Sequence, residues 1–171
     1  MEIDVLKSVI WSQFGAAIDS LEAAIAACPE HVWGDRSLKP EFWYTVYHTL
    51  FWLDYYLTET PETFAPPAPY NKDEMDPRGL LPDRVYTKDE MLTYLEHDRS
   101  KARARIAGLT EEKMRRIWHP KKPDFSVLEF LLYSMRHVQH HAAQLNVLLR
   151  QTTDDAPRWV SQAKTGLTHG T

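Results

Sequence analysis

Helical periodicity is the feature of this sequence that most restricts its fold. Over Ile3–Cys28, apolar side chains recur every three or four residues, while polar and acidic ones fall off the stripe. This pattern is typical of an amphipathic helix, which Pro29 would end. Comparable runs follow over residues 41–57, about 87–107 and about 126–151. The chain is therefore predicted to be all-α, with four long helices in a bundle.

Two of these helices begin with the same signal. Thr87 and Glu90, and again Ser126 and Glu129, have the three-residue spacing of a capping box. The helix over 41–57 is apolar almost all round, which is typical of a helix that is covered on more than one side. Either the segment that follows it or a second subunit would supply that cover.

The connections are less informative than the helices. Residues 58–86 are rich in proline and show no sustained periodicity. Loops of this length are often ordered lids or walls of a functional site, and a flexible linker is the alternative. The connection over 117–123 is predicted to be irregular, and we expect no strands. In the tail from about residue 152, the indole of Trp159 is predicted to pack back onto the bundle.

Composition and charge limit the class of protein. We expect a single domain over residues 1–171. A formal net charge of −4 argues against a nucleic-acid partner, and no apolar run is long and clean enough to span a bilayer. The one cysteine, Cys28, cannot form an internal disulfide, and the first residues lack the features of a signal peptide. These features predict a cytoplasmic protein.

Three histidines carry the strongest chemical signal. His137 and His141 are four residues apart in the last predicted helix, so their side chains project side by side toward the core or its edge. His48 lies in the all-apolar helix without an obvious charged partner. Imidazole is a common ligand of late first-row metals. Two imidazoles from one helix and one from a facing helix would make a three-ligand site for a divalent metal ion.

Other interpretations of the histidines stay open on spacing alone. Core histidines that are hydrogen-bonded to tyrosine or to the backbone would give the same pattern. Val138 occupies the position where a zinc protease carries its catalytic glutamate. His140 points toward a flank of its helix, which favours a surface position or one beside the ligands. Asp54, six residues after His48, points well away from it, so we do not include it among the ligands.

Aromatic side chains of the same helices are predicted to wall the site. Together with the proline-rich segment, the wall would consist of Tyr44, Trp52, Tyr55 and Tyr133. Gln144, in the turn that follows the histidine pair, is a candidate for orienting a ligand or solvent.

Three stretches of the sequence resemble the DinB-like (DinB/YfiT) superfamily of bacterial proteins. They are YHTLFWLDYYL around His48, the proline-rich segment leading into YTKDEMLTYLEHDRSKARARI, and HVQHHAAQL around His137. The resemblance covers most of residues 2–150. It implies a four-helix bundle with a long crossover loop between its second and third helices, often in a homodimer. It also implies a divalent-metal site whose ligands fall on His48, His137 and His141.

The resemblance leaves the activity open. Some members of the superfamily resemble S-transferases that use a low-molecular-weight thiol such as bacillithiol or mycothiol, and others resemble hydrolases. The chain would then be a metal-dependent enzyme that activates a small thiol or water. The alternative is a metal-stabilised dimeric binding module without turnover. Zinc and nickel are the first choices for the ion, and iron is chemically reasonable. Ala142 and Ala143 stand where many relatives have Arg-Gly, so a role for that arginine does not carry over.

Overall fold

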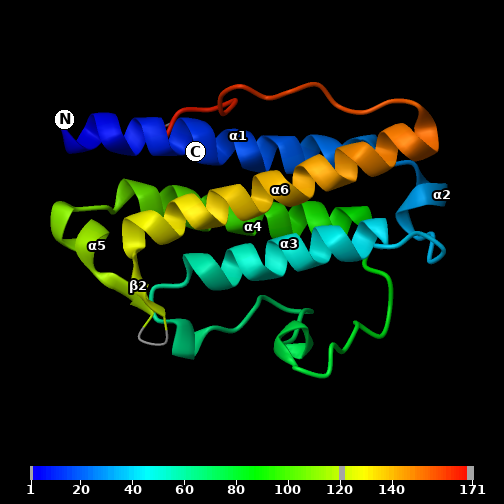
Figure 1. The fold of residues 1–171 in the computed structure, drawn as a ribbon, viewed down its shortest axis with the longest axis horizontal. Coiled ribbons are helices and arrows are strands. Elements are labelled where there is room, and N and C mark those ends of the chain that lie inside the picture. Colours follow the sequence, from blue (N-terminus) through cyan, green and yellow to red (C-terminus); the bar gives the residue numbers. More distant parts are fainter. Residues whose placement is uncertain (1, 120–121, 169–171) are drawn as a thin grey trace.

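The computed structural model describes residues 2–119 and 122–168. Most of this part of the chain is helical (Figure 1), and its long helices are α1 (Ile3–Ala27), α3 (Phe42–Leu57), α4 (Lys88–Ala107) and α6 (Val127–Thr153). Both α1 and α3 pack against α4 and α6. The prediction of an all-α fold is therefore confirmed. Of the predicted domain, Met1, residues 120–121 and residues 169–171 lie outside the described part.

The order of the helices in space includes a crossover. Figure 1 shows α3 and α4 running in one direction and α1 and α6 in the other. Residues 58–87 therefore return along the length of the bundle between α3 and α4, as the resemblance implies. Shorter elements complete the connections: α2 (Glu30–Trp33), α5 (Glu111–Arg115) and the 3-10 turns η1 (Pro61–Thr63) and η2 (Asp73–Met75). None of the helices in the described residues combines the length and the apolar character needed to cross a bilayer.

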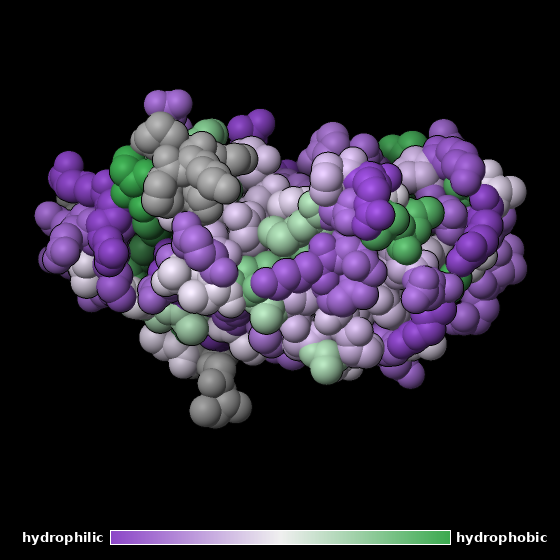
Figure 2. Space-filling view, turned by 90° about the horizontal axis from the view of Figure 1, so that it is seen from below, coloured by the Kyte–Doolittle hydropathy of each residue, from purple (hydrophilic) through white to green (hydrophobic). Residues whose placement is uncertain are grey.

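The crossover segment covers the apolar helix α3. Its Phe64 ring packs edge-on against Phe51, with ring centroids 5.4 Å apart, and its Tyr70 ring lies 5.9 Å from that of Tyr47. Phe64 and Tyr70 are both buried. On this side of the molecule, hydrophobic residues appear as separate small patches among hydrophilic ones (Figure 2). The chain itself thus supplies the cover that the composition of α3 requires, and the segment is a packed wall rather than a linker.

Both predicted caps are present. Glu90 donates its backbone N–H to the Thr87 hydroxyl at 3.2 Å, and its carboxylate accepts the Thr87 N–H at 2.8 Å, which completes a capping box. The Ser126 hydroxyl accepts the Glu129 N–H at 3.2 Å at the start of α6. The polar side chains therefore fix where α4 and α6 begin.

The prediction of an irregular, strand-free connection over 117–123 is wrong. β1 (Ile117–His119) pairs antiparallel with β2 (Lys122–Ser126), with Ile117 opposite Ser126. Strands this short give no readable alternation. Trp118 stacks on Phe130 of α6 with ring centroids 3.6 Å apart, so packing onto the bundle stabilises a hairpin that local sequence does not reveal.

The tail packs back onto the bundle, but not through its indole, because Trp159 is 73 % exposed. Instead, the Ala163 N–H donates to the Ser12 carbonyl at 2.8 Å and the Trp11 indole donates to the Thr165 carbonyl at 2.7 Å. At Gly15 an added Cβ would lie 2.6 Å from the Ala163 Cβ. The absence of a side chain at Gly15 therefore allows this close approach, and the main chain makes the contact that we predicted for Trp159.

Candidate metal centre

Three imidazoles converge where α3 packs on α6. His48 comes from α3, and His137 and His141 come from successive turns of α6. One ring nitrogen of each lies within 4.8 Å of those of the other two. The ring centroids are 5.6 Å apart for His48 and His137, 5.0 Å for His48 and His141, and 4.6 Å for His137 and His141. Each residue is partly exposed, so the cluster is open to solvent on one side.

Each ring is held by an oxygen acceptor. The Nδ1 of His48 lies 2.6 Å from a carboxylate oxygen of Glu74, and the Nδ1 of His141 lies 2.7 Å from the amide oxygen of Gln144. His137 is hydrogen-bonded to the backbone of Thr49. Because a carboxylate or amide oxygen can only accept, Nδ1 carries the proton in His48 and His141. Their Nε2 atoms keep a lone pair for a ligand bond.

Burial keeps two of the rings neutral. Together with the smaller effects of the neighbouring His141 and His48 rings, it lowers the pKa of His137 to about 3. Burial also lowers the pKa of His141 to about 4, against the hydrogen bond to Gln144, which raises it. Both imidazoles are therefore uncharged at pH 7, which is the form that binds a metal.

One atom tests whether the cluster fits an ion. The Nε2 of His137 is buried and has no hydrogen-bond partner among the described residues. An unpaired buried polar atom is costly, and coordination to a cation satisfies it. Three imidazole nitrogen donors are also ligands that zinc, nickel and iron accept. The residues present thus fit a divalent ion of this group.

Glu74 is a part of the site that sequence reasoning missed. Besides His48, its carboxylate accepts the Tyr44 hydroxyl at 3.0 Å and the Trp52 indole N–H at 3.2 Å. Its side chain is only 4 % exposed. Burial, followed by the negative charge of Glu74, raises the pKa of Tyr44. Glu74 lies in η2 of the crossover segment, and no spacing along the sequence connects it to α3.

The aromatic residues predicted to wall the site divide into two groups. The Tyr44 and Trp52 rings flank His48, with centroids 6.3 and 6.4 Å from its own. The Tyr55 ring packs edge-on against Phe64 and Trp118, and the Tyr133 ring stacks on Phe130. Tyr56, which we did not predict, lies 5.5 Å from the His137 ring. Tyr56 follows His48 by eight residues, which turns it about 80° around the axis of α3, so helical spacing did not indicate this contact.

A cavity of about 380 Å³ adjoins the cluster through Gln144, which lines it and also contacts His141. Lys39 and His140 are among the residues that line it, and His140 is exposed, as predicted. The remaining lining is mostly apolar and comprises Pro40, Thr45, Ala143, Leu145, Val147, Leu148 and Gln151. A small molecule with an apolar part would fit beside the imidazoles here.

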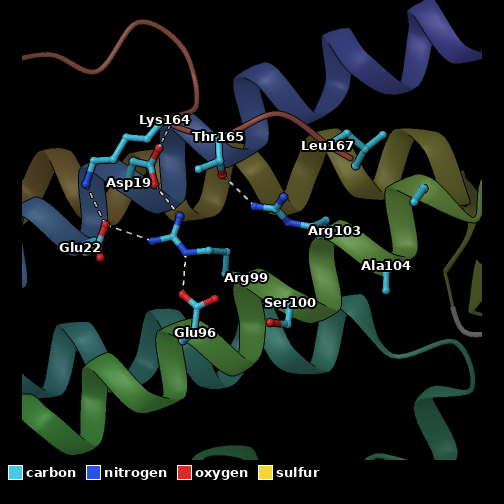
Figure 3. Close-up of a pocket in the computed structure, with 11 residues that line it drawn as sticks. Asp19, Glu22, Glu96, Arg99, Ser100, Arg103, Ala104, Lys164, Thr165 and Leu167 are labelled. Carbon is cyan, nitrogen blue, oxygen red and sulfur yellow. Dashed lines mark hydrogen bonds and ion pairs between the residues drawn. The ribbon is translucent and has the colours of Figure 1, made fainter. Parts of the chain in front are cut away.

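Another cavity, of about 800 Å³, lies between α1, α4 and the tail (Figure 3). Five of its charged side chains are paired with one another, and the sixth, Arg103, donates to the Gly166 carbonyl and the Thr165 hydroxyl. Arg99 bonds Asp19, Glu22 and Glu96, and Lys164 bonds Asp19 through its backbone and Glu22 through its ammonium group. These bonds attach the tail to two helices, so the charged side chains of this cavity have a structural role.

Comparison with known proteins adds one finding. The family model of the DinB superfamily matches residues 13–145. The matched range contains the three imidazoles and Glu74. No curated protein and no solved structure matches the chain.

Proposed function

The chain belongs to the DinB superfamily, and on that premise we propose that it is a metal-dependent enzyme in which His48, His137 and His141 hold a divalent ion. The reaction is activation of a small thiol or a water molecule, in an S-transferase or a hydrolase. The observation that carries the proposal is the convergence of three ring nitrogens within 4.8 Å, two of them on rings whose Nδ1 is already engaged. Zinc or nickel is the preferred ion, and iron comes next.

The roles of the residues follow from their contacts. When bound, a divalent ion supplies Lewis acidity that lowers the pKa of a coordinating water or thiol. His137 and His141 are neutral, so they leave the charge of the ion undiminished. Glu74 and Gln144 fix the orientation of two rings, and carboxylates in such positions also raise the basicity of the ligand.

The cavity beside Gln144 supports a substrate with an apolar part. Val147 and Leu148 would contact that part, while Lys39 would supply a cation for a polar group of the substrate. The Tyr44 hydroxyl is held by Glu74 at 3.0 Å, so it is already engaged and acts as a fixed wall rather than as an acid.

Metal content in a histidine variant tests the ligand set. His141→Ala removes one donor and should lower the metal content, measured by elemental analysis after dialysis, by about one equivalent per chain. His140→Ala is the matched control because this exposed ring lies next to His141. Full occupancy at the three-imidazole site in His141→Ala would contradict the assignment.

Turnover distinguishes the enzyme from a binding module. The metal-loaded protein should convert electrophiles in the presence of small thiols, or hydrolyse esters or amides, and the chelated protein should not. A large loss of stability on chelation without turnover of any substrate would favour the second candidate, a metal-stabilised dimeric module. Exposed Leu132 and Val147 on α6 support that candidate. A mass that stays monomeric at all concentrations in light scattering would contradict the homodimer. The free, buried Cys28 is in keeping with the cytoplasmic location that we propose.

A further inference from the structure

A second cluster of potential ligands lies on another side of α3, between α3 and α4. It consists of Asp54, His97 and Asp98, and one ligand atom of each lies within 4.8 Å of those of the other two. Asp54 follows His48 by six residues, which turns it about 120° away around the helix axis. The cluster is therefore separate from the three imidazoles.

The two carboxylates in this cluster differ in their partners. Asp54 is buried but satisfied, because the Lys101 ammonium group lies 2.5 Å from Oδ1 and the Tyr94 hydroxyl donates to Oδ2 at 3.1 Å. Asp98 is also completely buried, yet neither of its oxygens has a hydrogen-bond partner among the described residues. A buried carboxylate without a donor is among the most costly groups that a protein can contain.

Protonation does not remove this cost. Burial, followed by the nearby charge of Asp54, raises the pKa of Asp98 well above its usual value, and Lys101 lowers it by a smaller amount. A neutral Asp98 would lose its charge, but its carbonyl oxygen would still lack a donor. A cation satisfies both the charge and the lone pairs.

We propose that Asp54, His97 and Asp98 form a second divalent-cation site that would hold zinc or manganese. Two carboxylates and one imidazole are a mixed donor set that suits these ions. The Nε2 of His97 lies 3.5 Å from Oδ1 of Asp54 and its side chain is 45 % exposed, so the ring closes the buried pair on the solvent side. It also lines a cavity of about 390 Å³ between residues 67–70 and α4, which gives the ion a route inward.

Metal counting in combined variants tests the proposal. His137→Ala/His141→Ala removes two imidazole donors and leaves α4 unchanged. After dialysis against zinc, elemental analysis should find two equivalents in the wild type and one in this double variant. Addition of Asp98→Asn to the double variant should leave none. Asp89→Asn, an exposed acid on the same helix, should keep both equivalents. No zinc in the double variant, or one equivalent retained after Asp98→Asn, would overturn the second site.

A second variant guards against misfolding. His97→Gln alters a partly exposed side chain, so the core stays intact. In the double-variant background it should weaken manganese binding at least tenfold, measured by the electron paramagnetic resonance signal of free Mn²⁺, and unchanged binding would overturn the site. The outcomes also separate the two centres. One equivalent in the wild type that persists without His137 and His141 but disappears with Asp98→Asn would contradict the three-imidazole centre and support this one.

Discussion

Two clusters share α3 but differ in almost every property that governs metal binding. The first joins His48 to α6 and offers imidazole nitrogens at a partly exposed surface, and the side chains of Glu74 and Gln144 hold two of the rings. The second joins Asp54 to α4 and buries two carboxylates, of which only one is paired. The first is therefore held in its binding form without an ion, whereas the second carries an unmet charge until an ion or a proton arrives.

This difference gives the clusters opposite responses to pH. The depressed pKa values of His137 and His141 mean that acid favours the unfolded chain. The raised pKa of Asp98 means that base favours it. Stability measured on the metal-free protein can therefore report on each cluster separately.

The largest expected effect is that of the ion itself. Zinc at 100 to 1,000 times its dissociation constant should raise the free energy of unfolding by about 3–4 kcal/mol, because it binds only the folded chain. Denaturant titration with zinc or with chelator measures the difference. His137→Ala should remove most of the gain at the imidazole cluster, and His140→Ala should keep it. If zinc stabilises His137→Ala and His140→Ala equally, the imidazole cluster is not the stronger of the two zinc sites.

Acid should destabilise the metal-free protein through the imidazoles. Unfolded histidines take up protons below about pH 6.5, whereas folded His137 and His141 stay neutral down to about 3 and 4. The stability present above pH 6.5 should fall by about 2 kcal/mol for each ring between pH 6.5 and 5. Chelated wild type and His137→Gln compared by denaturant titration across this range isolate one ring. The same pH slope in both proteins would contradict a buried neutral His137.

Asp98→Asn should affect the stability of the metal-free protein in the opposite pH range, at alkaline rather than acidic pH. At pH 8 to 9 the metal-free variant should be more stable than wild type by about 2 kcal/mol, because it removes a buried carboxylate without a donor. Because the pKa of Asp98 is raised, the wild type loses stability as the pH rises toward that pKa. The difference in stability between the variant and the wild type should therefore shrink toward pH 4. The exposed control Asp89→Asn should change stability by less than about 0.5 kcal/mol at either pH. A destabilised Asp98→Asn would show that its carboxylate is satisfied.

The smallest effect concerns the orientation of His48. Glu74→Gln keeps an oxygen acceptor but removes its charge, and substitutions of this kind weaken metal binding by about tenfold, or 1.4 kcal/mol. Competition with a chromogenic chelator measures the affinity. Asp83→Asn, an exposed acid of the same crossover segment, should have no effect. An unchanged affinity in Glu74→Gln would show that α3 orients His48 without help from the crossover.

The comparison also shows why one cluster was predictable and the other was not. The pairing of His137 with His141 follows from helix geometry. The apolar sequence of α3 offers His48 no polar partner within its own helix, which marked it as a candidate ligand. Helix geometry relates Asp54 only to other residues of α3, and it correctly places Asp54 on a different side from His48. Its neighbours Lys101 and Asp98 lie on α4. The apolar periodicity of α3 and of α4 does not show that these two helices pack together.

The sequence by itself determined the long helices, the caps of two of them and the pair of imidazoles on successive turns, because each depends on residues no more than four positions apart. Tertiary structure alone decided that Glu74 holds His48 across 26 residues, that β1 and β2 pair, and that Asp98 is buried without a donor. The physical reason is that such contacts depend on how the chain closes on itself. Packing of the whole core fixes that closure, and local propensity does not.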